Sequence, residues 1–361
     1  LRSRGLGDVY KRQVTTIEYY DTAGRLIQTI RKGFGPNGED LADYIQFDEA
    51  GRIAKEYLST PFTGNNGVFV PVSEFEQSTQ TWSRTHLYEA STEGRIVETS
   101  GMHVGGKSIK YDYRLSNSSE PELSALEFRM QNNTTINKRM AARGAYQVVE
   151  EIDEDGHRIL LFTDSDGHTV LKRRVDGDVY HDTYMVYDAY DHLRCVLPPA
   201  AVDAYSSFDD QSLSAGNFLD LYAYFYIYDN DNQCVGVKYP GADWIYTVYD
   251  GDYRPILSQD GNQRKRDEWS FIKYDGLGRV VIEGIVKDKR TRDDLADIYE
   301  DVLVHEEYIG TEGPCRGYTD HIKMGQNRYI LTCIRYYDNY AFTEFSSDWS
   351  FANMASSASA K

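Results

Sequence analysis

Residues 274–279 read YDGLGR: an aromatic residue, an aspartate, two variable residues, a glycine and an arginine. The same order occurs as YDTAGR at 20–25 and as FDEAGR at 47–52. Apolar and polar residues then alternate, as in LIQTI at 26–30. Because such alternation indicates a half-buried β-strand, each copy is expected to mark a turn that leads into a strand.

The residue types in this unit fit a tight turn. An aspartate at the first turn position accepts hydrogen bonds from the backbone two residues on, and a glycine three residues later adopts positive φ without steric cost. A type I turn followed by such a residue is a common hairpin loop. Each unit is therefore predicted to form a β-hairpin. The complete copies supply these expected turn and stacking residues: Tyr20, Asp21, Gly24, Arg25, Phe47, Asp48, Gly51, Arg52, Tyr274, Asp275, Gly278 and Arg279.

Other copies of the unit are incomplete. Asp153 to Gly156 and Asp164 to Gly167 keep the aspartate and the glycine, and Tyr88-Glu89 leads to Gly94-Arg95 with two extra residues. Weaker copies begin at Tyr187-Asp188, Tyr228-Asp229, Tyr249-Asp250 and Tyr337-Asp338. At the glycine position these carry Asp191, Asn232, Tyr253 and Ala341. Aspartate and asparagine tolerate the left-handed region, whereas the turns with Tyr253 and Ala341 are expected to have another geometry.

The copies recur with a period in the twenties. The spacing is 27 residues from Asp21 to Asp48 and 25 residues from Asp250 to Asp275. Such a period is typical of a stacked array, and a single hairpin is marginally stable in water. Neighbouring hairpins must therefore join in a sheet. We predict a mostly β fold, in which tandem hairpins form one continuous sheet with short helical insertions.

The chain divides into four segments by composition. Residues 1–13 carry four basic residues and one acidic residue. They resemble a translated sequencing-adapter artefact, in which case the true N-terminus and any export signal would lie upstream. The alternative is a real basic N-terminal arm. Residues 14–120 are expected to hold the first repeats and long loops. Residues 121–345 are expected to hold the main array, with short helices near 199–206 and 291–302. Residues 346–361 fade into alanine, serine and lysine and are expected to fray.

Composition excludes several classes of partner and site. The 361 residues carry 39 basic and 57 acidic side chains, a net charge of −18. Phosphate backbones and anionic membranes both favour clustered basic residues, so neither nucleic acid nor an anionic lipid surface is expected as a partner. The most apolar stretch, 218–228, is too short to span a membrane. The sequence contains no Cys-x-x-Cys and no His-Glu-x-x-His, and we assign no catalytic residue, metal ligand or cofactor.

Three strings imitate binding motifs. GMHVGGKS at 101–108 matches a phosphate-binding loop, but the strand-like IKYDYR follows where the motif requires a helix. GFGPNG at 33–38 matches a dinucleotide motif, but its proline and the strand-like residues after it disfavour the required helix. Asp164 and Asp166 suggest calcium, yet the spacing of an EF-hand loop is not met. Turn and loop roles are the expectation for all three.

The repeat copies, together with several connecting strings, resemble the YD repeats of Rhs proteins, in particular those of Bacteroides-like gut bacteria. The supporting strings are TGNNG at 63–67, RCVLPP at 194–199, KYPGADW at 238–244 and KYDGLGR at 273–279, and the resemblance covers roughly residues 14–345. It implies a large exported protein whose sheet spirals into a hollow shell. A C-terminal core domain usually closes that shell, often ahead of a variable toxin. Neither the core signature nor its self-cleaving acids occur in this sequence, so the resemblance implies a partial shell and carries over no catalytic residue.

These observations lead to a structural expectation. The chain is expected to be a non-enzymatic fragment of an exported Rhs/YD-repeat protein, secreted or at the cell surface, whose partners are the further repeats, core domain and any toxin of its own full-length chain. An alternative is a cell-surface adhesin that uses some of its 30 tyrosines to stack on glycans. A third is a nucleotide-binding protein centred on Lys107.

Overall fold

The computed structural model describes most of the chain. The described residues are 15–79, 82–101, 107–132, 135–205, 210–212, 219–303, 305–310, 313–321 and 329–337. The chain divides into two compact units. The first contains residues 1–126 and 140–182, and the second contains residues 127–139 and 183–361. Residues 1–13 and 346–361 lie outside the described part, and the boundary expected near residue 120 stays a prediction.

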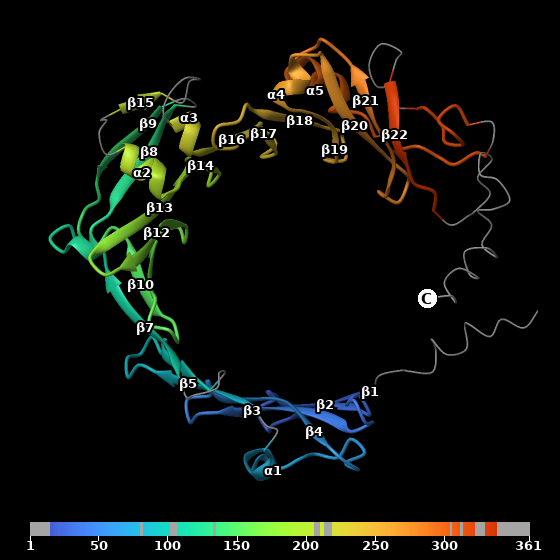
Figure 1. The fold of residues 1–361 in the computed structure, drawn as a ribbon. Helices are drawn as coiled ribbons and strands as arrows, with labels where there is room; N and C mark the ends of the chain where they lie inside the picture. The colour runs from blue at the N-terminus through green and yellow to red at the C-terminus, as the bar shows by residue number, and fades with distance from the viewer. Residues whose placement is uncertain are drawn as a thin grey trace, which may run out of the picture. The chain divides into compact units, whose positions relative to one another are not determined.

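The first unit is an antiparallel meander with a helical insertion (Figure 1). Its strands pair in chain order, except that β7 pairs directly with β10. The strands are β1 (Thr15–Tyr20), β2 (Leu26–Lys32), β3 (Asp40–Phe47), β4 (Ile53–Phe62), β5 (Ser83–Tyr88), β6 (Ile96–Ser100), β7 (Ser108–Leu115), β10 (Gln147–Ile152), β11 (Arg158–Thr163) and β12 (Thr169–Asp176). Helix α1 (Val72–Gln77) and a 3₁₀ turn, Pro121–Leu123, interrupt the connections.

The second unit continues the same pattern. Its strands are β13 (Val179–Tyr187, whose first residues belong to the first unit), β14 (Leu193–Leu197), β16 (Tyr224–Tyr228), β17 (Cys234–Lys238), β18 (Ile245–Tyr249), β19 (Pro255–Gln259), β20 (Glu268–Tyr274), β21 (Val280–Lys287) and β22 (Tyr329–Ile334). The helices are α2 (Pro199–Tyr205), α3 (Leu219–Tyr222), α4 (Gly261–Arg264) and α5 (Arg292–Tyr299). A separate three-stranded sheet consists of β8 (Leu126–Asn132), β9 (Thr135–Met140) and β15 (Asp210–Ser212).

The prediction of a mostly β protein is confirmed. Nineteen strands form one antiparallel sheet with short helical insertions, and within the described residues β1 and β22 each have a partner on one side only, so the sheet is not closed. Helices α2 and α5 lie where short helices were expected. Each contains a run of apolar residues at helical spacing, and α5 also begins with a Thr291–Asp294 capping box.

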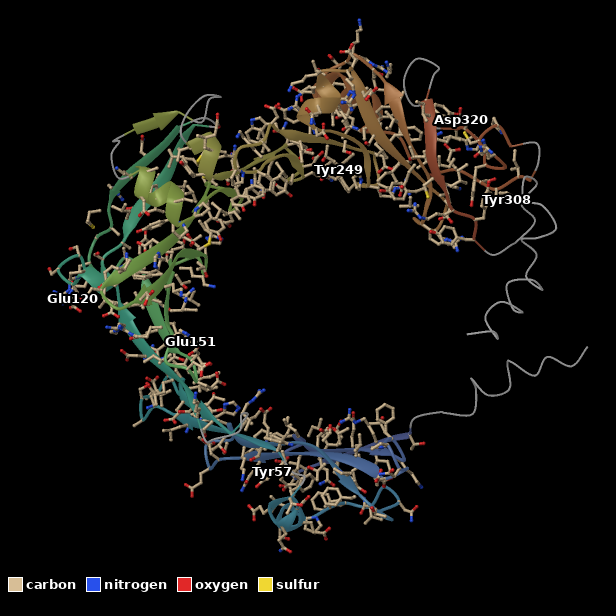
Figure 2. All side chains as sticks on the ribbon, viewed as in Figure 1. Tyr57, Glu120, Glu151, Tyr249, Tyr308 and Asp320 are labelled. Atoms are coloured by element: carbon tan, nitrogen blue, oxygen red, sulfur yellow. The ribbon has the colours of Figure 1, made fainter. Side chains whose placement is uncertain are left out.

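The core is divided into local clusters, each beneath an inserted element. In the first unit, α1 covers one face of β3 and β4 (Figure 1), and its Phe75 packs with Tyr57 and Ile30. Tyr57 is labelled on this side of the strands in Figure 2. In the second unit, Leu295 and Tyr299 of α5 pack with apolar residues of β18 to β21. A hairpin thus buries one face when a connection folds back over it.

Candidate functional site: the repeat turns and the arginine–tyrosine ladder

The turn at Asp275 shows how the repeat sequence produces its geometry. The Asp275 N–H donates to the Arg279 carbonyl at 3.0 Å, and the Gly278 N–H donates to the Asp275 carbonyl at 2.9 Å. The side-chain Oδ1 of Asp275 accepts from the backbone N–H groups of Leu277 and Arg279, both at 2.9 Å. Gly278 has φ of 74°, which an L side chain adopts only with strain. The aspartate thus satisfies the N–H groups that the turn leaves unpaired.

The same bonds recur at the other aspartate turns. In each, the aspartate N–H donates to the carbonyl four residues on, and Oδ1 accepts from the N–H of that residue. These turns begin at Asp21, Asp48, Asp153, Asp164, Asp188, Asp229 and Asp250. Their third following residues all have positive φ and are Gly24, Gly51, Gly156, Gly167, Asp191, Asn232 and Tyr253. Asp338 and Ala341 lie outside the described residues.

The expectation of another geometry at Tyr253 is wrong. Tyr253 has φ of 61° and donates its N–H to the Asp250 carbonyl at 2.9 Å, as a glycine does elsewhere. Its side chain is 64% exposed, so the ring lies in solvent and meets no neighbour that would prevent the left-handed conformation. Four hydrogen bonds between Asp250 and the turn backbone hold the backbone there and offset the strain.

The arginine of the repeat binds the second carboxylate oxygen of its own aspartate. Arg279 Nε donates to Asp275 Oδ2 at 2.7 Å, and Arg52 Nε donates to Asp48 Oδ2 at 2.8 Å. The same contact joins Arg25 to Asp21 and Arg254 to Asp250. Histidine takes this position after Asp153, Asp164 and Asp188 and places its Nδ1 near Oδ2. One carboxylate therefore serves the turn backbone with one oxygen and the side chain four residues on with the other.

The arginines that follow a turn also stack on an aromatic residue later in the chain. This residue begins the following turn in the pairs below, except in Arg95–Tyr113, where the ring lies within β7. In the first unit, the distance from the guanidinium carbon to the ring centroid is 4.3 Å for Arg25 over Phe47 and 4.2 Å for Arg52 over Tyr88. Arg95 stacks on Tyr113 at 4.3 Å. The second unit contains Arg254 over Tyr274 at 5.1 Å, Arg279 over Tyr337 at 4.4 Å and His192 stacked on Tyr228 at 4.5 Å. These contacts are cation–π pairs for arginine, and they join consecutive repeats.

The tyrosine hydroxyls complete the link between repeats. Tyr88 OH donates to the Ile53 carbonyl at 2.8 Å, and Ile53 directly follows the arginine on which the ring stacks. The same bond, to the residue after the arginine position, joins Tyr113 to Ile96, Tyr249 to Cys234, Tyr274 to Pro255 and Tyr337 to Val280. We call the aspartate–arginine pairs and the stacked tyrosines together the arginine–tyrosine ladder. Tyrosine at the start of a turn therefore fastens that turn to the previous one.

The first two aromatic residues of the array, Tyr20 and Phe47, lack the hydroxyl bond to a previous turn. Tyr20 ends β1 and is 55% exposed, and its hydroxyl donates to Glu18. Phe47 stacks under its arginine but has no hydroxyl to donate. Tyr187 ends β13, directly before the Asp188 turn. The predicted repeat residues thus fall on strand ends and turns, as the motif indicates.

Hydrogen bonding lowers the pKa of several turn acids. The backbone N–H of Arg25 is the largest cause of the lowered pKa of Asp21, and the N–H of Arg52 acts likewise on Asp48. For Glu89, the side chain of Arg95 is the main cause and brings the pKa to about 2. For Asp275, burial acts strongly in the opposite direction, but the bonds from Arg279 still leave the pKa lowered. The acids therefore remain ionised in their turns.

The strings that imitate binding motifs lie in connections between strands. Residues 102–106 of the phosphate-loop string lie outside the described part, but Ser108 begins strand β7, and Lys107 Nζ binds Asp155 at 2.8 Å. Residues 33–38 form the tight connection between β2 and β3. Asp164, Asp166 and His168 bring ligand atoms within 4.8 Å of one another, while Oδ1 of Asp164 already accepts from two N–H groups. Within the described residues, no helix has the length and apolar character to cross a membrane.

Sequence reasoning missed the ladder itself. The turn residues were predicted, but Arg95, Tyr113 and Arg254 were not assigned roles, and the copies were treated as separate turns. The signal is present in the sequence: an arginine after one turn is followed, two strands later, by an aromatic residue before the next turn. What was missing was the register that brings the two side chains together.

Comparisons with known proteins agree with this fold. Residues 7–114 match a family model described as a domain of unknown function, DUF6443. No curated protein matches the chain. Among solved structures, the chain resembles TcdB2-TccC3 without its hypervariable C-terminal region, with a TM-score of 0.50 and 13% identity over 76% of this chain. A TcdB2-TccC3-Cdc42 structure gives a TM-score of 0.49 at 13% identity and 76% coverage, and a Photorhabdus luminescens Tc holotoxin pore gives 0.47 at the same identity and coverage.

The likeness extends to a small part of those proteins. The chain covers 13% of the length of the TcdB2-TccC3 and TcdB2-TccC3-Cdc42 chains and 12% of the holotoxin chain. At 13% identity the similarity shows a shared fold. The likeness to TcdB2-TccC3 at a TM-score of 0.50 therefore shows that a mostly β, hairpin-array fold like that of this chain occurs within a much longer protein.

Proposed function

We propose that this chain is a wall segment of an exported Rhs/YD-repeat protein, in which the sheet acts as a structural barrier around other parts of the same full-length chain. The observation that carries the proposal is the arginine–tyrosine ladder. In both units, consecutive turns are fastened by the same stacked pair and the same hydroxyl-to-carbonyl bond. A protein that only needed flexible repeats would have no use for bonds that fasten one turn to the next.

The chemistry of the turns supports a structural and non-enzymatic role. The carboxylates of Asp48 and Asp275 are each engaged by the turn backbone and by an arginine. A general base or metal ligand needs an oxygen that can reach a substrate or ion, and these oxygens already serve the fold. The fold shared with the TcdB2-TccC3 structure at a TM-score of 0.50 supports the same assignment. Export, an enclosed toxin and closure by a core domain belong to the proposal as its cellular setting.

The ladder also bears on the glycan-binding alternative. That alternative rested on the high tyrosine content, but Tyr88, Tyr113, Tyr249 and Tyr274 each use the hydroxyl to bind a neighbouring turn. At these positions the tyrosine hydroxyl is therefore already used by the fold. A wall segment explains this composition without a ligand.

The test uses the full-length protein, obtained from the gene with its flanking sequence and probed by limited proteolysis. We expect the region C-terminal to this chain to resist cleavage in the native protein. Arg52→Ala combined with Tyr88→Ala should open the wall and expose that region. Tyr20→Ala is the matched control, because Tyr20 is exposed and contacts only Glu18 through its hydroxyl. Equal cleavage of the C-terminal region in the native protein and in the double variant would contradict a barrier role.

A further inference from the structure

A cluster of charged side chains lies buried in the second unit, outside the ladder. Lys273 of β20 and Glu306 both have fully buried side chains, and Lys273 Nζ donates to Glu306 Oε1 at 3.0 Å. The same Nζ is in contact with Oδ1 of Asp320. Asp320, labelled in Figure 2, lies beside β22, where Tyr329 OH donates to its Oδ2 at 3.1 Å. An amine, two carboxyl groups and a phenol therefore meet in one site.

The surroundings hold these groups in place, with Lys273 and Glu306 fully buried and the Asp320 side chain 21% exposed. Oε2 of Glu306 accepts from Thr319 Oγ1 at 2.7 Å and from the His321 N–H at 2.9 Å. The ring of Tyr329 packs edge-on against Phe271, which is buried. Lys273 is thus held by Glu306 on one side and reaches the carboxyl group of Asp320 on the other. The amine has no room to turn toward solvent.

The charges of this site do not balance. One ammonium faces two carboxylates, and taking such ions out of water costs several kcal/mol for each ion unless they are fully compensated. A reaction that removes one positive and one negative charge from the interior would relieve that cost. Lys273 contacts both carboxylates, and removing its charge together with that of Asp320 would leave Glu306 with its bonds from Thr319 and His321.

We propose that Lys273 and Asp320 condense to form an intramolecular isopeptide bond. A bond forms between Lys273 Nζ and Asp320 Cγ, and one C–O bond of the Asp320 carboxyl group breaks. Two of the three ammonium protons leave with that oxygen as water, and the third stays on the amide nitrogen. No oxidant, reductant or cofactor is consumed. The inference does not depend on the proposed function of the chain.

Neighbouring groups supply the roles that this condensation needs. Glu306 Oε1, at 3.0 Å from Nζ, accepts a proton from the amine and delivers protons to the departing oxygen. Tyr329 OH, at 3.1 Å from Oδ2, stabilises the negative charge that develops on that oxygen as nitrogen attacks. Burial raises the pKa of Tyr329, so its hydroxyl keeps the proton that it donates. Holding the amine against the carboxyl group replaces the encounter of two separate reactants.

The bond would tie strand β20 to a segment 47 residues later in the chain. It would close a loop covalently, as a disulfide does, but reducing agents would not open it. The long connection that carries α5 would then be anchored at both ends, since β21 follows β20 directly and Asp320 precedes β22. Such a cross-link would hold this connection on the sheet under force or heat.

The first test is the intact mass of the purified wild-type chain. We expect a mass below that of the full sequence by one water molecule. Tryptic digestion should then yield a branched peptide joining residues 267–279 to residues 317–323, with Lys273 uncleaved. The proposal is overturned if the folded wild-type chain has the full mass. It is equally overturned if the water loss lies within the 317–323 peptide alone, as a succinimide at Asp320 would give.

Variants separate the roles of the residues. Asp320→Ala removes the electrophile and Glu306→Gln removes the proton carrier, so both should restore the full mass, whereas Tyr329→Phe should lower the linked fraction. Lys238→Met is the matched control, because Lys238 is also buried and lies 3.5 Å from a carboxylate oxygen of Asp220, yet its loss should leave the missing water unchanged. Retention of the branched peptide in Glu306→Gln would refute the role of Glu306. If a variant does not fold, the mass of the wild-type chain still decides the proposal.

Discussion

Replacement of Gly278 by valine tests the hairpin geometry directly. Gly278 has φ of 74°, and a Cβ placed there would meet no atom within 4 Å. The substitution therefore creates no clash with neighbouring groups, and its cost comes from the backbone conformation alone. Gly278 also donates its N–H to the Asp275 carbonyl, so a backbone that relaxes toward negative φ would lose a hydrogen bond of the turn.

The size of the effect follows from two opposing contributions. A left-handed conformation costs an L residue roughly 1–2 kcal/mol, and valine is among the residues least suited to it. Replacing glycine also reduces the freedom of the unfolded chain, which stabilises by about 0.4–1 kcal/mol where the native conformation is tolerated. We expect Gly278→Val to lower the stability of the hairpin by about 1 kcal/mol or more. Gly278→Asn should cost less than half of this, because asparagine adopts positive φ more readily.

Hydrogen exchange of the β20–β21 hairpin, residues 268–287, is the local assay. A loss of about 1 kcal/mol should speed exchange of its protected amides roughly fivefold. Denaturant unfolding followed by tryptophan fluorescence gives a second readout, since Trp269 lies buried in β20. Exchange in the valine variant that matches the wild type would refute the left-handed turn. Equal damage from asparagine and valine would show that the cost comes from something other than φ.

Four further outcomes are expected. Tyr253→Asn should raise stability by about 0.5–1 kcal/mol in denaturant unfolding, because asparagine accepts φ of 61° at lower cost. A double-mutant cycle with Arg52→Ala and Tyr88→Ala should give a coupling of about 0.5–1 kcal/mol, and a coupling of zero would remove the ladder. The pKa of Glu89 is about 2 in the folded chain, against 4.5 for the free side chain. Its contribution to stability is therefore fully present above pH 4.5 and is lost as the pH falls toward 2. Glu89→Gln should make the stability of the protein depend less on pH in this range, as measured by acid unfolding followed by circular dichroism. Isothermal titration with ATP should show no binding to the wild type or to Lys107→Ala, and binding that Lys107→Ala abolishes would restore the phosphate-loop assignment.

Much of the fold could be predicted from the sequence because the turn is a local structure. Aspartate, glycine and their spacing of three residues determine the bonds seen at Asp275, and the alternation after each copy determines the strand. Tyr253 shows the limit of this reasoning. Propensity alone assigns a left-handed tyrosine a high cost, but four bonds made with Asp250 decide the conformation.

Long-range contacts could not be read from the motif. Helix α1 begins after Pro71 without a side-chain cap, and its Phe75 packs on Tyr57 of β4 and in one cluster with Ile30 of β2, contacts that no motif in the sequence marks. The cluster at Lys273 joins four segments that share no motif, so the spacing of residues in the sequence gives no sign of it. Glutamate usually lies on the protein surface, and only the fold shows that the side chain of Glu306 is fully buried.

One further feature of the array does follow from spacing, once the strands are counted. Neighbouring antiparallel strands run in opposite directions. Turns separated by two strands therefore lie at the same edge of the sheet, where edge means the side on which the strands end, and turns separated by one strand lie at opposite edges. Spacings in the twenties therefore place the Asp21 and Asp48 turns on one edge. The spacing of 11 residues from Asp153 to Asp164 contains the single strand β11 and must place the Asp153 turn on the other edge. The contact of Asp155 with Lys107, in the connection from β6 to β7, is what that placement requires. The number of residues between successive acidic turn residues thus indicates whether two turns lie at the same edge or at opposite edges. The ladder lies at the edge whose turns are separated by the longer spacing.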